Sequence, residues 1–287
     1  MALRDRIGPK RIVVKTASEN KASQQVNVKA TIGRKVDYYS SSIGATFAGK
    51  AVAKKSALAK TEHSEFGEMP DNTSLKPLGR PNSNMSIRWM TSNNNCVELT
   101  SAYGLLRITP ISTNTVRVNF AKGAFDKIAE IPDEIRTTIA PRWRCRETRD
   151  LVEITCDKLI VRIDKKTSAV SFYTSKEKLL LSESAKMPRQ VADVPKNQNW
   201  TYFDWGKKEI LKARGIGDGE WLELSNTARY ISHGVKFDKP ACILSNNGYQ
   251  ILVPTGKLTM CCTIPMYGPY LYTEGEKQID YFFRSAL

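Results

Sequence analysis

Hydrophobic and polar residues alternate most clearly between residues 151 and 183. Leu159, Val161 and Ile163 share one face of an extended segment, and the side chains between them fall on the other. Residues 164–168 (DKKTS) then supply polar turn formers, and residues 170–173 begin a new run of residues that favour strands. With Leu179–Leu181 as a third short strand, the stretch predicts a β-meander.

The same strand pattern continues over most of residues 85–287. YGLLRIT (103–109) and TVRVNF (115–120) are typical strand sequences. SNNGYQ (245–250) places Asn-Gly between two alternating runs, which is typical of a β-hairpin. Residues 187–200, with their prolines and asparagines, predict a loop instead. We therefore predict an all-β fold, an antiparallel β-sandwich, for residues 85–287.

Four arginines surround Trp143 in residues 141–149 (PRWRCRETR). An arginine patch with an aromatic ring can bind phosphate groups or nucleic acid. Charged side chains also protect an exposed edge strand from pairing with another chain. The sequence favours the edge strand and leaves polyanion binding as the alternative.

Residues 1–84 differ from the rest of the chain in pattern and charge. They lack sustained alternation, and residues 62–84 are rich in Glu, Pro, Asn, Gly and Ser, which predicts a linker or disordered spacer. The chain of 287 residues has a net charge of +15, and residues 1–84 carry 15 basic against 7 acidic residues. We expect a basic, low-order extension here, with a nucleic-acid-binding tail as the alternative. Met85 would make a natural start for the sandwich.

The six cysteines show no CxxC pair, and no histidine lies at metal-ligand spacing from them. We therefore expect no metal site, and buried thiols in a reducing compartment. The N-terminus has no apolar signal-peptide core, and no apolar run approaches the roughly 18 residues of a membrane helix. These features predict a cytoplasmic protein without a membrane span.

The sequence offers little catalytic chemistry. Residues 214–220 (RGIGDGE) contain three glycines, but their spacing and flanking pattern do not match a dinucleotide-binding loop. Of the two histidines, only His233 lies in the strand-rich region, and no second poised group accompanies it for acid–base work on a sugar. A G-x-S-x-G nucleophile motif is absent. We expect no cofactor and no catalytic residue in this chain.

The sequence of residues 161–183, VRIDKKTSAVSFYTSKEKLLLSE, resembles part of the N-terminal domain of glycoside hydrolase family 31 (GH31), the α-glucosidase and α-xylosidase family. Four further segments resemble pieces of that domain in the family's order: TVRVNF, RGIGDGE, KPACILSNNGYQILV (239–253) and EKQIDYFF (276–283). The resemblance covers roughly residues 85–287.

This resemblance implies a galactose-mutarotase-like β-sandwich that packs on a catalytic (β/α)8 barrel. In the family, a segment after the glycine-rich turn comes near the substrate pocket. The resemblance therefore makes four residues candidates for contact with an α-glycoside or oligosaccharide at the domain junction: Glu220, Trp221, Arg229 and Tyr230. Packing within the sandwich is the alternative role for these side chains, because the family's pattern after the turn is not reproduced cleanly.

Enzymes of the family hydrolyse α-glycosides with retention, using two carboxylates on the barrel. Their W-x-D-M-x-E nucleophile motif is absent here, and a barrel would need about 250 further residues. We therefore expect the non-catalytic N-terminal domain of an α-glycosidase, inactive alone, whose barrel comes from the same or a split gene. Such a sandwich should expose an apolar patch. The alternative is a stand-alone binding module that uses its basic tail and residues 141–149 on nucleic acid or another polyanion, with nucleic acid the less favoured partner.

Overall fold

The computed structural model is built mainly of β-strands. It describes residues 66–76, 79–80, 83–126, 129–193, 196–214, 221–233, 240–254 and 258–286. The chain separates into two compact units, Met1–Glu62 and His63–Leu287, and every described residue lies in the second unit. The expected basic extension therefore lies mostly outside the described residues. Within the described ranges the regular structure is antiparallel strand and four short 3-10 turns, which confirms the all-β prediction. No helix in these ranges is long and apolar enough to cross a membrane.

The largest sheet, called the nine-stranded sheet below, joins the first strands of the chain to the last. Its order is β1 (Ile87–Ser92), β2 (Val97–Ser101), β3 (Leu105–Pro110), β4 (Thr115–Ala121), β19 (Gln278–Ser285), β16 (Tyr249–Val253), β15 (Ala241–Ser245), β12 (Leu211–Arg214) and β13 (Trp221–Glu223). β19 therefore lies between strands that are far from it in sequence.

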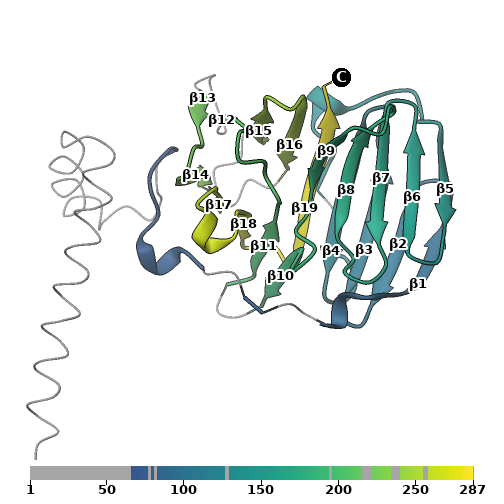
Figure 1. Ribbon diagram of the computed structural model, residues 1–287, viewed down its shortest axis with the longest axis horizontal. Helices are drawn as coiled ribbons and strands as arrows, with labels where there is room; N and C mark the ends of the chain where they lie inside the picture. The colour runs from purple at the N-terminus through teal and green to yellow at the C-terminus, as the bar shows by residue number, and fades with distance from the viewer. Residues whose placement is uncertain are drawn as a thin grey trace, which may run out of the picture. The chain divides into compact units, whose positions relative to one another are not determined.

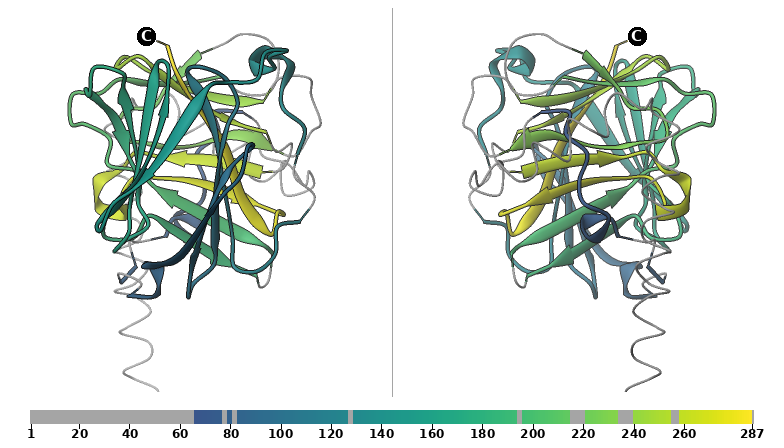
Figure 2. Two further views of the ribbon diagram at one scale, coloured as in Figure 1. Left: turned by 90° about the vertical axis from the view of Figure 1, so that its right-hand side faces the viewer. Right: turned by 90° about the vertical axis from the view of Figure 1, so that its left-hand side faces the viewer.

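Two five-stranded sheets face the nine-stranded sheet. The meander sheet has the order β5 (Trp143–Glu147), β6 (Leu151–Cys156), β7 (Leu159–Asp164), β8 (Val170–Thr174) and β9 (Leu179–Ser182). The aromatic sheet has the order β10 (Arg189–Ala192), β11 (Gln198–Tyr202), β18 (Tyr270–Glu274), β17 (Leu258–Cys262) and β14 (Ala228–His233). The 3-10 turns are η1 (Asn72–Ser74), η2 (Ser83–Met85), η3 (Asp133–Ile135) and η4 (Pro265–Tyr267). Figure 1 shows β5–β8 in front of β1–β4, and Figure 2 shows these layers from the side.

The predicted meander is confirmed in both register and burial. β7 pairs with β8, with Val161 opposite Phe172, and the aliphatic face of β7 is fully buried. That face joins one apolar cluster with residues from all three sheets. Phe172 stacks on Phe283 of β19 with ring centroids 3.9 Å apart, which ties the meander sheet to the nine-stranded sheet.

The local turn predictions have mixed outcomes. The hairpin at 245–250 is confirmed, because β15 pairs with β16 and Gly248 adopts a φ of 84° that favours glycine. The predicted loop at 187–200 is wrong, since it contains β10 and the start of β11. Pro188 lies just before β10, so it interrupts no ladder, and the asparagine-rich part enters β11 with Asn199 buried.

Part of the segment predicted to be a linker packs on the aromatic sheet. The backbone of Gly67 donates to the Tyr230 carbonyl at 2.8 Å, and the Tyr230 N–H donates to the Glu68 carbonyl at 3.0 Å. Leu75 packs against the outer apolar cluster of this sheet, which includes Tyr202, Tyr270 and Tyr272. The Lys76 ammonium lies 3.9 Å from the centre of the Trp200 ring. The sandwich as folded thus includes residues before Met85.

A buried ion pair joins the three sheets. Glu183, just after β9, and Arg189 of β10 are both fully buried, with 2.9 Å between Oε2 and Nη1. Glu183 also accepts from the Val170 N–H and the Tyr281 hydroxyl, each at 2.9 Å. Arg189 donates to the Ser168 hydroxyl at 2.8 Å. Burial raises the pKa of the Glu183 carboxyl, while Arg189 and these two donors oppose the rise.

Candidate functional site

The four candidate sugar contacts occupy different parts of the structure. Glu220 lies outside the described residues. Trp221 begins β13 at the edge of the nine-stranded sheet and is 42% exposed, with the Arg214 guanidinium 5.7 Å from its ring centre. Arg214 is in turn held by Glu134 at 3.0 Å. Trp221 therefore presents an accessible ring whose neighbouring cation is already ion-paired.

Arg229 and Tyr230 lie on β14, in the aromatic sheet, and are already engaged by residues 66–76. The Arg229 guanidinium donates to the Gly67 carbonyl at 3.1 Å, and burial lowers its pKa. Burial raises the pKa of Tyr230, whose hydroxyl hydrogen-bonds with Ser74. Among the described atoms no ring contact, ion pair or hydrogen bond joins either residue to Trp221, so the structure does not gather the three into one site.

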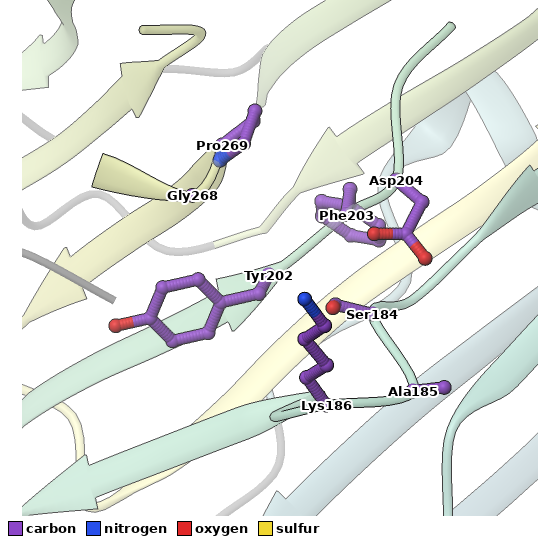
Figure 3. A pocket seen from close by; sticks show the side chains of 8 residues that line it. All are labelled: Ser184, Ala185, Lys186, Tyr202, Phe203, Asp204, Gly268 and Pro269. Carbon is purple, nitrogen blue, oxygen red and sulfur yellow. The ribbon is translucent and has the colours of Figure 1, made fainter. Parts of the chain in front are cut away.

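A cavity of about 300 Å³ opens elsewhere on the sandwich. It is lined by the β9–β10 connection, the end of β11 and the turn after η4, through Ser184, Ala185, Lys186, Tyr202, Phe203, Asp204, Gly268 and Pro269. Figure 3 shows the Lys186 and Ser184 side chains ending between the two aromatic residues, with the Tyr202 hydroxyl directed away from them. No sequence motif marks this cavity, because its walls come from three segments separated along the chain.

Backbone hydrogen bonds hold the cavity walls in place. The Ser184 N–H donates to the Tyr202 carbonyl at 2.9 Å, and the Asp204 N–H donates to the Ser182 carbonyl at 2.9 Å. The Phe203 N–H donates to the Pro269 carbonyl at 3.0 Å, while Gly268 makes the turn with a φ of 66°. Hydrogen bonds between the segments that line the cavity therefore set its shape.

The side chains that line the cavity can bind a small polar molecule. Lys186 and Asp204 are exposed and offer opposite charges, Ser184 adds a hydroxyl, and Phe203 supplies an apolar wall. These groups can hold a small polyhydroxylated molecule through hydrogen bonds and ring contact. Asp204 is the one carboxylate among the described residues that line the cavity.

The thiols are buried, as the sequence predicted. Five of the six cysteines are buried, and Cys145 is half-buried. Burial raises the pKa of Cys156 and Cys242 to about 12 and that of Cys262 to about 11. At neutral pH these groups stay protonated, which makes them poor nucleophiles and poor metal ligands. The described residues contain no cluster of three His, Cys, Asp or Glu side chains placed to hold a metal ion.

Comparisons with known proteins identify the fold. No protein-family model matches the sequence, and no curated protein matches it. Solved structures do match: a GH31 α-xylosidase from a soil metagenome, complexed with xylose, superposes with a TM-score of 0.56 at 16% identity over 69% of this chain. A GH31 dextranase from Flavobacterium johnsoniae, complexed with isomaltotriose, gives a TM-score of 0.60 at 16% identity over 71% of this chain.

A cycloalternan-forming enzyme from Listeria monocytogenes, in complex with a pentasaccharide substrate, gives a TM-score of 0.57 at 13% identity over 70% of the chain. This chain spans only 32% of the xylosidase, 26% of the dextranase and 21% of the cycloalternan-forming enzyme. The described sandwich therefore has the fold of one part of GH31 enzymes, and the resemblance seen in the sequence is confirmed at the level of the fold.

Proposed function

We propose that this chain is the non-catalytic N-terminal β-sandwich of a GH31 α-glycosidase. The observation that carries the proposal is the coverage of the structural matches. About 70% of this chain superposes on GH31 enzymes, yet it spans a third or less of each of them. The sequence resemblance at residues 161–183 and 276–283 points to the same family independently.

In the proposed role the sandwich packs against a catalytic barrel that hydrolyses terminal α-glycosidic bonds with retention. Trp221 is the described candidate best placed to meet a sugar, because its ring is accessible while Arg229 and Tyr230 are held by residues 66–76. The buried free thiols fit a cytoplasmic location.

The mass and activity of the native protein test this proposal. We expect the protein from its natural source to exceed the 32.2 kDa of this sequence, and the larger species to release sugar from a p-nitrophenyl α-glycoside with retained configuration. The 287-residue chain alone should show no turnover of the same substrate, because its sequence contains no W-x-D-M-x-E nucleophile motif. A native species at or below 32.2 kDa without an associated barrel chain would overturn the proposal.

The isolated chain should also self-associate. A surface made to pack on a barrel stays uncovered when the sandwich is alone, and large apolar side chains such as Ile139 and Met266 are exposed. We expect size-exclusion chromatography with light scattering to show a mass that rises with protein concentration. A monomer over the whole concentration range would argue against a missing barrel.

A further inference from the structure

The end of the meander sheet is an open strand edge. β5 pairs only with β6, and no backbone hydrogen bond in the described ranges joins it to any other strand. Figure 1 shows β5 as the outermost strand of its layer, at the same end of the sandwich as β1, the edge strand of the nine-stranded sheet. Such an edge presents N–H and C=O groups that an added strand can pair with.

The two faces of β5 differ in chemistry with a period of two. Arg144 and Arg146 are exposed, whereas Trp143 and Cys145 are half-buried and pack against the interior cluster. Ile87 and Met90 of β1 also pack half-buried against this cluster. The apolar side chains at this end of the sandwich are therefore only partly shielded from solvent. Along β5, Trp143 and Cys145 alternate with Arg144 and Arg146.

The arginines of this edge form no ion pair with any described residue. Glu153 lies across from Arg146 in the ladder, but its carboxylate is bound by Arg162 of β7 at 2.7 Å. Glu147, at the end of β5, is bound by Lys165 at 2.7 Å. Arg142 and Arg149, which flank the strand, are exposed as well. The guanidinium groups are thus available to an acidic partner.

We propose that β5 accepts an extended segment of a partner protein in which apolar and acidic residues alternate. The segment adds as a strand to the meander sheet. Its apolar side chains cover Trp143 and Cys145, and its carboxylates pair across the strands with Arg144 and Arg146. The same arginines disfavour pairing of two β5 edges, because like charges would then face each other. The edge is thereby selective for a partner of opposite charge.

Fluorescence anisotropy of labelled peptides on the full chain tests this assignment. We expect a peptide of alternating valine and glutamate to bind, and one of alternating valine and lysine not to bind. In R144E/R146E the preference should reverse, with at least about a tenfold loss of affinity for the glutamate peptide. The matched control K176E/K178E changes the same charge at exposed positions beside β9 and should leave binding unchanged. Circular dichroism checks that both variants fold.

Three further probes separate strand addition from simple charge attraction. A valine–glutamate peptide methylated on alternate backbone nitrogens should lose binding, and an alternating serine–glutamate peptide should bind more weakly. Hydrogen exchange of the β5 amides should slow only with the unmodified valine–glutamate peptide. Equal binding of the methylated peptide, or of single-stranded oligothymidylate with the same dependence on Arg144 and Arg146, would overturn the proposal, as would absence of binding by every peptide.

Discussion

Replacing Arg189 by methionine is expected to lower the free energy of unfolding by about 3–5 kcal/mol at pH 7.5, as for other buried ion pairs that lose one partner. The variant would leave the Glu183 carboxylate fully buried among apolar residues without its counter-ion. It would also remove the donors to Ser168. Urea unfolding monitored by tryptophan fluorescence measures the change.

The loss should depend on pH with a definite sign. Without the guanidinium, burial raises the pKa of Glu183 further above its ordinary value. The folded variant then retains a proton that the unfolded chain releases near its ordinary pKa of about 4.3. Stability is therefore fullest below that value and falls as pH rises toward the folded pKa. We expect a smaller loss at pH 5 than at pH 7.5.

The double variant E183Q/R189M provides the control for the charge argument. A glutamine carries no charge. Its carbonyl oxygen can accept from the Val170 N–H in place of Oε2, and its amide NH2 can donate to the Tyr281 hydroxyl oxygen in place of Oε1. We expect it to recover most of the stability lost in R189M and to remove the dependence on pH. If the free energy of unfolding of R189M lies within about 1 kcal/mol of the wild-type value, the ion pair does not hold the three sheets together.

Starting the chain at Met85 is expected to destabilise the sandwich by roughly 3 kcal/mol relative to a chain that starts at His63. The shorter chain loses two backbone hydrogen bonds to Tyr230, the Lys76 contact with Trp200 and the packing of Leu75. A net hydrogen bond is worth about 0.5–1.5 kcal/mol and a partly exposed cation–π contact about 0.5–1 kcal/mol. Together these losses are a large part of a total stability of about 5–15 kcal/mol.

The comparison of the two truncations with the full chain is also a test of the domain boundary. A chain that starts at His63 should match the full chain in its urea midpoint, because the contacts divide there. The chain that starts at Met85 should bind a hydrophobic dye through the uncovered outer face of the aromatic sheet. Equal stability of the two truncations would mean that residues 66–76 contribute nothing and that the sandwich begins at Met85.

The sequence predicted those parts of the fold that depend on neighbouring residues. The alternation in residues 159–163 determines which face of that strand is buried, and Asn-Gly in residues 245–250 determines the hairpin. Both features depend on neighbouring residues alone, so the sequence predicts them. The strand at Arg189–Ala192 was missed because nearby prolines suggest a loop, although Pro188 lies outside the ladder. The packing of residues 66–76 on the aromatic sheet was missed because this segment is mostly polar. Only a few of its side chains make the contacts, Leu75 and Lys76 among them.

The site was less accessible to prediction than the fold. The cavity combines Lys186, Asp204 and Pro269, whose proximity depends on sheet topology and not on spacing along the chain. The burial of Arg189 could not be foreseen either, since a lone arginine resembles a surface residue until its partner Glu183 is placed beside it. The edge position of β5 was predicted correctly from the charge of residues 141–149.

The place of β19 has a consequence for synthesis on the ribosome. β19 joins β4 to β16 in the middle of the nine-stranded sheet, so the two halves of that sheet stay separate until residues 278–285 have been made. Until then, the edges of β4 and β16 that pair with β19 have no hydrogen-bond partner strand, and pairing of such distant segments is slow. Nascent chains that end before Gln278 should accordingly engage chaperones, and release from them should follow emergence of the final strand.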